Sequence, residues 1–162
     1  MEVETSAGVA RERIRTIGRI LLGLFLIGAG IGHWTFAREG FQAQVPPWLP
    51  LDKDFVVLAS GVVEILLGLA VLVVPNRLFG LPARAIVGWI AAAFFVAIFP
   101  GNISQLVTSI QENGVADSVG LVVRLFFQPL LVAWALWSTG AWRAWRQWVA
   151  ERRATAPPAP RA

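Results

Sequence analysis

The stretch Ser60-Gly61-Val62-Val63-Glu64-Ile65-Leu66-Leu67-Gly68 decides how this chain folds. It lies within an apolar run from about Phe55 to Val74, which is long enough to cross a lipid bilayer as a helix. Glu64 lies near the middle of that run, where a carboxylate costs at least about 2.5 kcal/mol on insertion scales. Ser60, Glu64 and Gly68 share one helix face because their spacing is i, i+4, i+8. We therefore expect this face to contact protein or water, and its small residues to admit a neighbouring helix closely.

The composition of the whole chain indicates a membrane protein. Of the 162 residues, 56% are hydrophobic, and the mean hydropathy of +0.63 is too high for a soluble domain of this length. The chain has no cysteine, which excludes thiolate catalysis, iron–sulfur ligation and zinc–thiolate sites. Its one histidine and its initiator methionine cannot supply the two conventional axial ligands of a haem. We expect no metal site, so a redox role would need an organic cofactor or a partner protein.

Four apolar runs predict an all-α fold, a four-transmembrane-helix bundle over residues 17–138 that follows a polar, cytoplasmic N-terminal segment at residues 1–16. The expected spans are residues 17–36, 55–74, 83–99 and 118–137. Pro100-Gly101-Asn102 is expected to end or break the third span, and Ser104 to Asp117 to form a polar loop. Pro129 is expected to kink the fourth span.

The segment after the fourth span is both aromatic and basic. A helix over residues 139–153 would place Trp142, Trp145 and Trp148 within one arc, with arginines beside them. This pattern predicts an amphipathic, interfacial extension of the last helix. Residues 154–162 are rich in Ala and Pro and are expected to be disordered.

The distribution of arginine predicts the topology. Arginines gather before the first span, between the second and third spans and after the fourth, whereas the other two loops carry only Arg38 and Lys53. The positive-inside rule therefore places both termini in the cytoplasm. The net charge of +4 comes from these helix ends, and without a basic patch interleaved with aromatics we expect no nucleic-acid partner.

Two features leave alternatives open. The loop of residues 37–54 carries Val45-Pro46-Pro47-Trp48-Leu49-Pro50, which would either dock on the membrane surface or fold as a lid over the mouth of the bundle. Gly28 and Gly32 have GxxxG spacing, which serves either packing within the chain or formation of a homo-oligomer.

Polar residues recur in the outer half of all four spans. The candidate site residues are His33, Glu64, Asn102, Arg124 and Gln128. One interpretation is architectural: a buried Glu64–Arg124 ion pair that fixes how the helices dock. The other is a small ligand pocket that opens outward under the Pro-rich loop, with His33 at its mouth within reach of water.

At these residues the sequence resembles the DoxX-like family of small bacterial membrane proteins. The resemblance spans about Gly28 to Trp137 and rests on Gly32-His33-Trp34 with Phe41, Val45-Pro46-Pro47-Trp48-Leu49-Pro50, the stretch from Ser60 to Leu69, Phe99-Pro100-Gly101-Asn102, and Arg124 with Gln128. The chain departs from the family where it has Gly101 in place of a frequent alanine, and Phe126 in place of a frequent proline. The resemblance implies a four-helix bundle in the bacterial inner membrane. It also implies a link to quinone-linked oxidoreductases, among them a thiosulfate:quinone oxidoreductase, and to oxidative-stress defence.

We carry forward two hypotheses on function. The first is an accessory or quinone-binding subunit of a membrane oxidoreductase system, with a quinone as the possible cofactor and a membrane-associated redox enzyme as the partner. In that case the candidate residues would donate hydrogen bonds to the quinone carbonyls, and Glu64 would hold Arg124 or move a proton. The second is a non-enzymatic structural or assembly subunit whose polar cluster is architectural. A permease is disfavoured because the sequence shows no inverted repeat.

Overall fold

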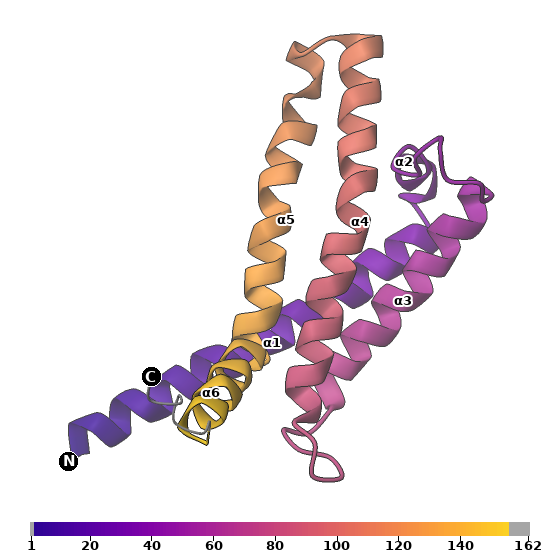
Figure 1. Cartoon of the computed structure of the whole chain (residues 1–162). Helices are drawn as coiled ribbons and strands as arrows, with labels where there is room; N and C mark the ends of the chain where they lie inside the picture. The colour runs from indigo at the N-terminus through magenta and orange to yellow at the C-terminus, as the bar shows by residue number, and fades with distance from the viewer. Residues whose placement is uncertain (1, 156–162) are drawn as a thin grey trace, which may run out of the picture.

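The computed structural model describes residues 2–155, with side chains from Ser6 onward, and shows an all-α protein (Figure 1). Within these residues the elements follow in the order α1 (Glu2–Trp34), α2 (Arg38–Gln42), α3 (Lys53–Val73), α4 (Ala83–Asn113), the 3-10 turn η1 (Ala116–Ser118), α5 (Val119–Ser138) and α6 (Ala141–Ala154). The helices α1, α3, α4 and α5 are long and apolar enough to cross a membrane. The predicted four-helix bundle of a multi-pass membrane protein is confirmed.

The helix α4 is longer than the sequence suggested. It continues through Pro100 to Asn113, so the polar loop predicted from Ser104 to Asp117 is wrong over most of its length. Proline removes one backbone hydrogen bond, but spanning helices tolerate this loss where neighbouring groups compensate. The connection to α5 is instead short, and Gly114 opens it with a φ of 84°, a left-handed conformation that favours glycine.

Four glycines bring the backbones of α1 and α3 into contact. A Cβ added at Gly68 would lie 2.6 Å from the carbonyl oxygen of Gly23, and one at Gly30 would lie 2.6 Å from the carbonyl oxygen of Gly61. Only residues without a side chain permit this approach, as in other helix pairs within membranes. Gly28 takes no part in it, because a Cβ at Gly28 would meet nothing within 4 Å. Its predicted role in packing within the chain is therefore wrong, and the homo-oligomer stays a prediction.

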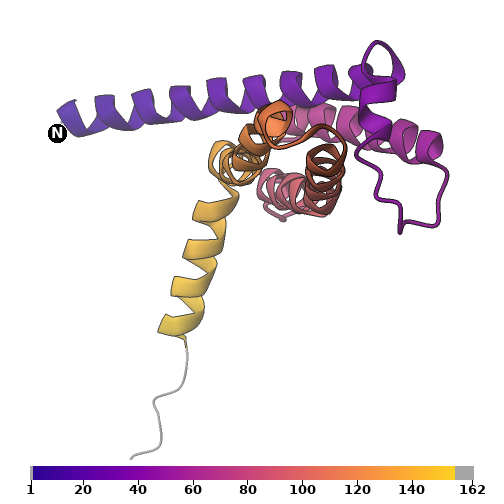
Figure 2. The same cartoon turned by 90° about the horizontal axis from the view of Figure 1, so that it is seen from above.

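The helices α4 and α5 form a second antiparallel pair that crosses the first (Figures 1 and 2). The two pairs meet in an apolar core, in which Leu22 and Leu26 of α1 are fully buried against residues of α3, α4 and α5. The indole nitrogen of Trp134 donates a hydrogen bond to the carbonyl oxygen of Gly18 at 2.9 Å, which ties α5 to α1. Large apolar side chains remain exposed on the outer faces of all four long helices, where a bilayer would cover them.

The last helix does not continue α5. Gly140 has a φ of 79° and separates α5 from α6, which leaves in a new direction (Figure 2). The extension of the last helix is therefore present as a separate element. Of the tail predicted to be disordered, Ala154 ends α6, Thr155 is a turn residue, and the remainder lies outside the described residues.

The long helices place the loops at two opposite ends. The beginning of α1, the turn between α3 and α4, and α6 lie at one end, whereas α2 and the turn between α4 and α5 lie at the other (Figure 1). This arrangement positions the polar residues of the outer half next to α2.

Candidate functional site

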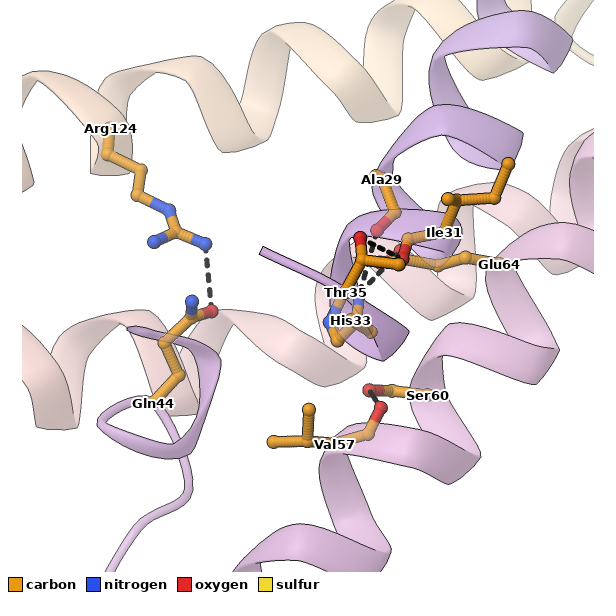
Figure 3. A network of polar contacts seen from close by, with 9 residues as sticks. All are labelled: Ala29, Ile31, His33, Thr35, Gln44, Val57, Ser60, Glu64 and Arg124. Atoms are coloured by element: carbon orange, nitrogen blue, oxygen red, sulfur yellow. Dashed lines mark hydrogen bonds and ion pairs between the residues drawn. The ribbon is translucent and has the colours of Figure 1, made fainter. Parts of the chain in front are cut away.

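His33 lies in the last turn of α1 and is buried, with 5% of its surface exposed. Its Nδ1 is 2.9 Å from the carbonyl oxygen of Ala29 and 3.2 Å from the carboxylate of Glu64 (Figure 3). Both neighbours accept hydrogen bonds, so Nδ1 carries the proton in the neutral ring. The ring stacks on Phe41 with 3.6 Å between the centroids. The expectation that His33 is open to water at the mouth is wrong, because Phe41 covers it.

Glu64 is buried on α3, and its Oε2 accepts no hydrogen bond within the described part of the chain. Nδ1 of His33 is close enough for an ion pair with Oε2 when the imidazole is charged, but in the geometry of the structure the Nδ1 hydrogen bond goes to the nearer carbonyl of Ala29. A carboxylate oxygen that is buried without a donor is costly. A ligand that brings a hydroxyl or an N–H would satisfy it.

Arg124 of α5 binds the loop that follows α2. Its Nη2 donates a hydrogen bond to Oε1 of Gln44 at 2.8 Å (Figure 3). Nη1 donates a longer one of 3.4 Å to Oε1 of Gln105. The guanidinium also lies 6.0 Å from the centroid of Phe41. Arg124 and Glu64, both of which the structure describes, form no ion pair. The architectural prediction of a direct Glu64–Arg124 pair is therefore wrong, because a loop that the sequence could not place supplies the partner.

A second contact joins α2, which precedes this loop, to the first turn of α3, which follows it. The guanidinium of Arg38 pairs with the carboxylate of Asp54, with Nε 2.6 Å from Oδ1, and Gln42 donates to the same carboxylate at 2.9 Å. The hydrogen bond from Arg38 to Asp54 raises the pKa of this guanidinium, so both groups stay charged near neutral pH. The loop is thus attached to α3 and to α5.

The loop covers an outer cavity of about 270 Å³. Val45 and Pro46 are buried in its wall, Leu49 lines it too, and Trp48 contributes although 69% of it is exposed. The loop therefore lies over the bundle as a lid would, and Trp48 remains available to a membrane surface. The floor of the outer cavity includes His33, Ser60, Glu64 and Arg124.

A second, larger cavity of about 690 Å³ lies between α1, α4 and α5. Its wall is mostly apolar and includes the aromatic residues Phe25, Phe95, Phe127 and Trp134. Phe41, Glu64, Ile98 and Arg124 line both cavities. The outer cavity, which carries more of the polar groups, therefore adjoins the more apolar inner cavity at a carboxylate, a guanidinium and two apolar side chains.

The two remaining candidates differ in position. Gln128 is buried one turn beyond Arg124 and lines the inner cavity, with its Oε1 unpaired among the described residues. Asn102 is also buried, and neither polar atom of its side chain has a partner in the described part of the chain. It lines neither of the two cavities. The structure thus brings four of the five candidates to the cavities and leaves Asn102 apart from them.

Comparison with protein families gives one match, over residues 22–139, to the family described as "Domain of unknown function (DUF8561)". The chain belongs to this family. No match is found among curated proteins or among solved structures. The DUF8561 region contains all five candidates and every residue that lines the two cavities.

The candidate residues predicted from the sequence do not include Gln44 and Gln105, the two residues that bind Arg124. The one sequence signal for Gln44 is its place immediately before Val45 and the proline run. Gln105 was assigned to a loop, although it is one turn from Gly101 on α4.

Proposed function

We propose that this chain binds a lipid-soluble quinone across the two adjoining cavities. It would act as a quinone-binding or accessory subunit of a membrane oxidoreductase system. The observation that carries the proposal is the boundary at Glu64 and Arg124, where the cavity that holds most of the polar groups adjoins a more apolar, aromatic one. An amphipathic molecule with a polar ring and an apolar tail matches this arrangement, and both volumes are near the usual range of about 300–1,000 Å³ for small-molecule sites.

The polar groups at this boundary suit both redox forms of a quinone. Arg124 has donors that could bind a quinone carbonyl, and Glu64 has an acceptor without a donor that could bind a quinol hydroxyl. Gln128 adds an amide that could do either. His33 holds its Nδ1 proton toward Ala29 and Glu64, so Nε2 is left as the acceptor of the ring.

The resemblance to the DoxX-like family supports the same proposal. We also propose the bacterial inner membrane as the location, with both termini in the cytoplasm. The clustering of the arginine-rich ends at one end of the bundle supports this topology (Figure 1).

The test is titration of the full chain in nanodiscs with a short-chain quinone analogue. Arg124→Met removes a charge-assisted donor, so we expect binding to weaken roughly 10- to 150-fold. Glu64→Gln should weaken binding of the quinol more than binding of the quinone. The carboxylate can accept a hydrogen bond from a quinol hydroxyl, but it has no proton to donate to a quinone carbonyl. Glu112→Gln and Arg77→Gln, at exposed positions outside both cavities, are the matched controls and should bind as the wild type does.

An architectural subunit is the second candidate, and the ties of the loop to Asp54 and Arg124 favour it. In that case neither the wild type nor any variant binds the analogue, whereas Arg124→Met lowers the melting temperature. Binding by the wild type that Arg124→Met leaves unchanged would contradict the proposed site.

A further inference from the structure

The helix α6 points away from the bundle, in a direction across that of the four spanning helices. Figure 1 looks nearly along α6, whereas the four long helices extend across the view. Figure 2, turned by 90°, shows α6 leading away from the side of the bundle. A helix that crosses every spanning helix at the end of the bundle lies along the surface of the bilayer that they cross.

Contacts with the bundle fix this direction. Nη2 of Arg143 donates to the carboxylate of Glu12 at 2.8 Å, and the same carboxylate is 3.6 Å from the buried Arg15. The first turn of α6 packs against α4 and α5 after the left-handed Gly140, and the Arg143–Glu12 pair adds a side-chain link to α1. The role of Arg143 is therefore accounted for within the chain.

The exposed side of α6 is aromatic. Trp142, Trp145 and Trp148 are each between 43% and 50% exposed, and Trp142 and Trp145 lie with their ring centroids 5.0 Å apart. The three tryptophans are spaced three residues apart, and Val149, seven residues after Trp142, lies on the same side. The four side chains therefore form an apolar arc along one side of the helix. Tryptophan is enriched at the membrane–water interface, which is the surface along which α6 runs.

Arginines flank this arc. Arg146 and Arg153 line one shallow hollow of α6 together with Trp145, and neither has a carboxylate partner among the side chains described from Ser6 to Thr155. The guanidinium of Arg152 lies 4.3 Å from the ring centroid of Trp148. The only carboxylate of the helix, Glu151, falls on the other flank of the arc. Two unpaired guanidinium groups beside a tryptophan face complement phosphate groups at a bilayer surface.

We propose that α6 docks on the headgroups of anionic phospholipids, with its tryptophan arc in the interface and Arg146 and Arg153 on the phosphates. This surface lies outside the DUF8561 region and is independent of the quinone proposal. It would fix the depth and the rotation of the bundle in the membrane according to the lipid composition.

The test uses single cysteines, because the chain has none of its own. Val149→Cys in the arc and Gln147→Cys off the arc each carry an environment-sensitive fluorophore, with the full chain in nanodiscs of phosphatidylcholine alone or with phosphatidylglycerol. We expect phosphatidylglycerol to shield the label at position 149 from a water-soluble quencher and to leave the label at 147 accessible.

The charge is tested by replacing both flanking arginines. Arg146→Gln with Arg153→Gln should raise the phosphatidylglycerol fraction needed for half-maximal shielding about fivefold or more, because each arginine near an anionic surface contributes about a factor of five. Arg146→Lys with Arg153→Lys should retain the shielding. Arg11→Gln with Arg13→Gln is the matched control at exposed positions of α1 and should have no effect.

Three results would overturn the proposal. The label at 149 could stay open to the quencher in every lipid mixture, which would leave the arc to a protein partner. Shielding could be equal with and without phosphatidylglycerol, which would exclude recognition of anionic lipid. The α1 control could match the α6 variant, which would assign the effect to the overall charge.

Discussion

The two faces of α1 meet their neighbours in opposite ways. Toward α3 the backbones touch, with glycines opposite one another at Gly23 and Gly68 and at Gly30 and Gly61. Toward α4 and α5 the side chains are large and line a partly open cavity of about 690 Å³. The contrast shows how a small bundle makes room for a ligand. The helices α1 and α3 are in backbone contact, whereas aromatic and polar side chains separate α1 from the crossing pair α4 and α5. The unpaired polar atoms of Glu64 and Gln128 lie on the open side.

The largest expected effect comes from adding a side chain where the backbones of α1 and α3 touch. Gly68→Val would place a Cβ 2.6 Å from the backbone of Gly23, where no side chain can move aside, and should destabilise the protein by roughly 3 kcal/mol. Gly28→Val is the matched control, because its Cβ would meet nothing within 4 Å, and should change stability by less than about 0.5 kcal/mol. Reversible unfolding in detergent measures both. Equal losses would show that α1 and α3 are not in backbone contact.

A second prediction separates the partners of Arg124. Double-mutant cycles of Arg124→Met with Gln44→Ala and with Glu64→Gln share one variant, so their coupling energies compare directly. We expect about 1.5–3 kcal/mol for the cycle with Gln44, which loses a hydrogen bond to a charged group, and less for the cycle with Glu64. A coupling energy that is larger with Glu64 than with Gln44 would mean that Arg124 pairs with Glu64, as the sequence suggested.

The third prediction concerns the cover of the open side. Asp54→Asn removes the charge that holds Arg38 and should speed hydrogen exchange in residues 37–52 while leaving the melting temperature nearly unchanged, because the pair lies at the surface. Asp117→Asn, an exposed carboxylate at the same end of the bundle, is the control. Unchanged exchange in the loop would mean that this contact does not hold the cover.

The sequence predicted the four spans better than it predicted where α4 ends or which glycines pack against a neighbouring helix. Apolar runs and the cost of burying Glu64 are local properties, and they were sufficient to predict the four spans. The topology that the arginine-rich ends predict stays a prediction. The end of α4 was wrong because a helix breaker at Pro100 was given more weight than the packing that compensates for it. The glycines of the tight contact could not be told from Gly28, because GxxxG spacing does not identify which face meets a neighbour.

For the site, the depth of polar residues in the spans predicted which residues lie near one another but not how they pair. The spans brought His33, Glu64, Arg124 and Gln128 to similar depth, and all four line the cavities. Which charge meets which partner depends on a loop whose path is set by tertiary contacts, above all that of Gln44 with Arg124. Asn102 shows the same limit, because similar depth did not bring its side chain to either cavity.

The most direct test of the central claim is the quinone content of the protein extracted from its own membrane without detergent. Organic extraction and mass spectrometry would give the amount per chain for the wild type, for Arg124→Met and for Gly28→Val. We predict about one quinone per chain in the wild type and in Gly28→Val, and a large loss in Arg124→Met, whose charge lies where the two cavities meet. Equal quinone in all three, at the level of the surrounding lipid, would contradict a site at this boundary.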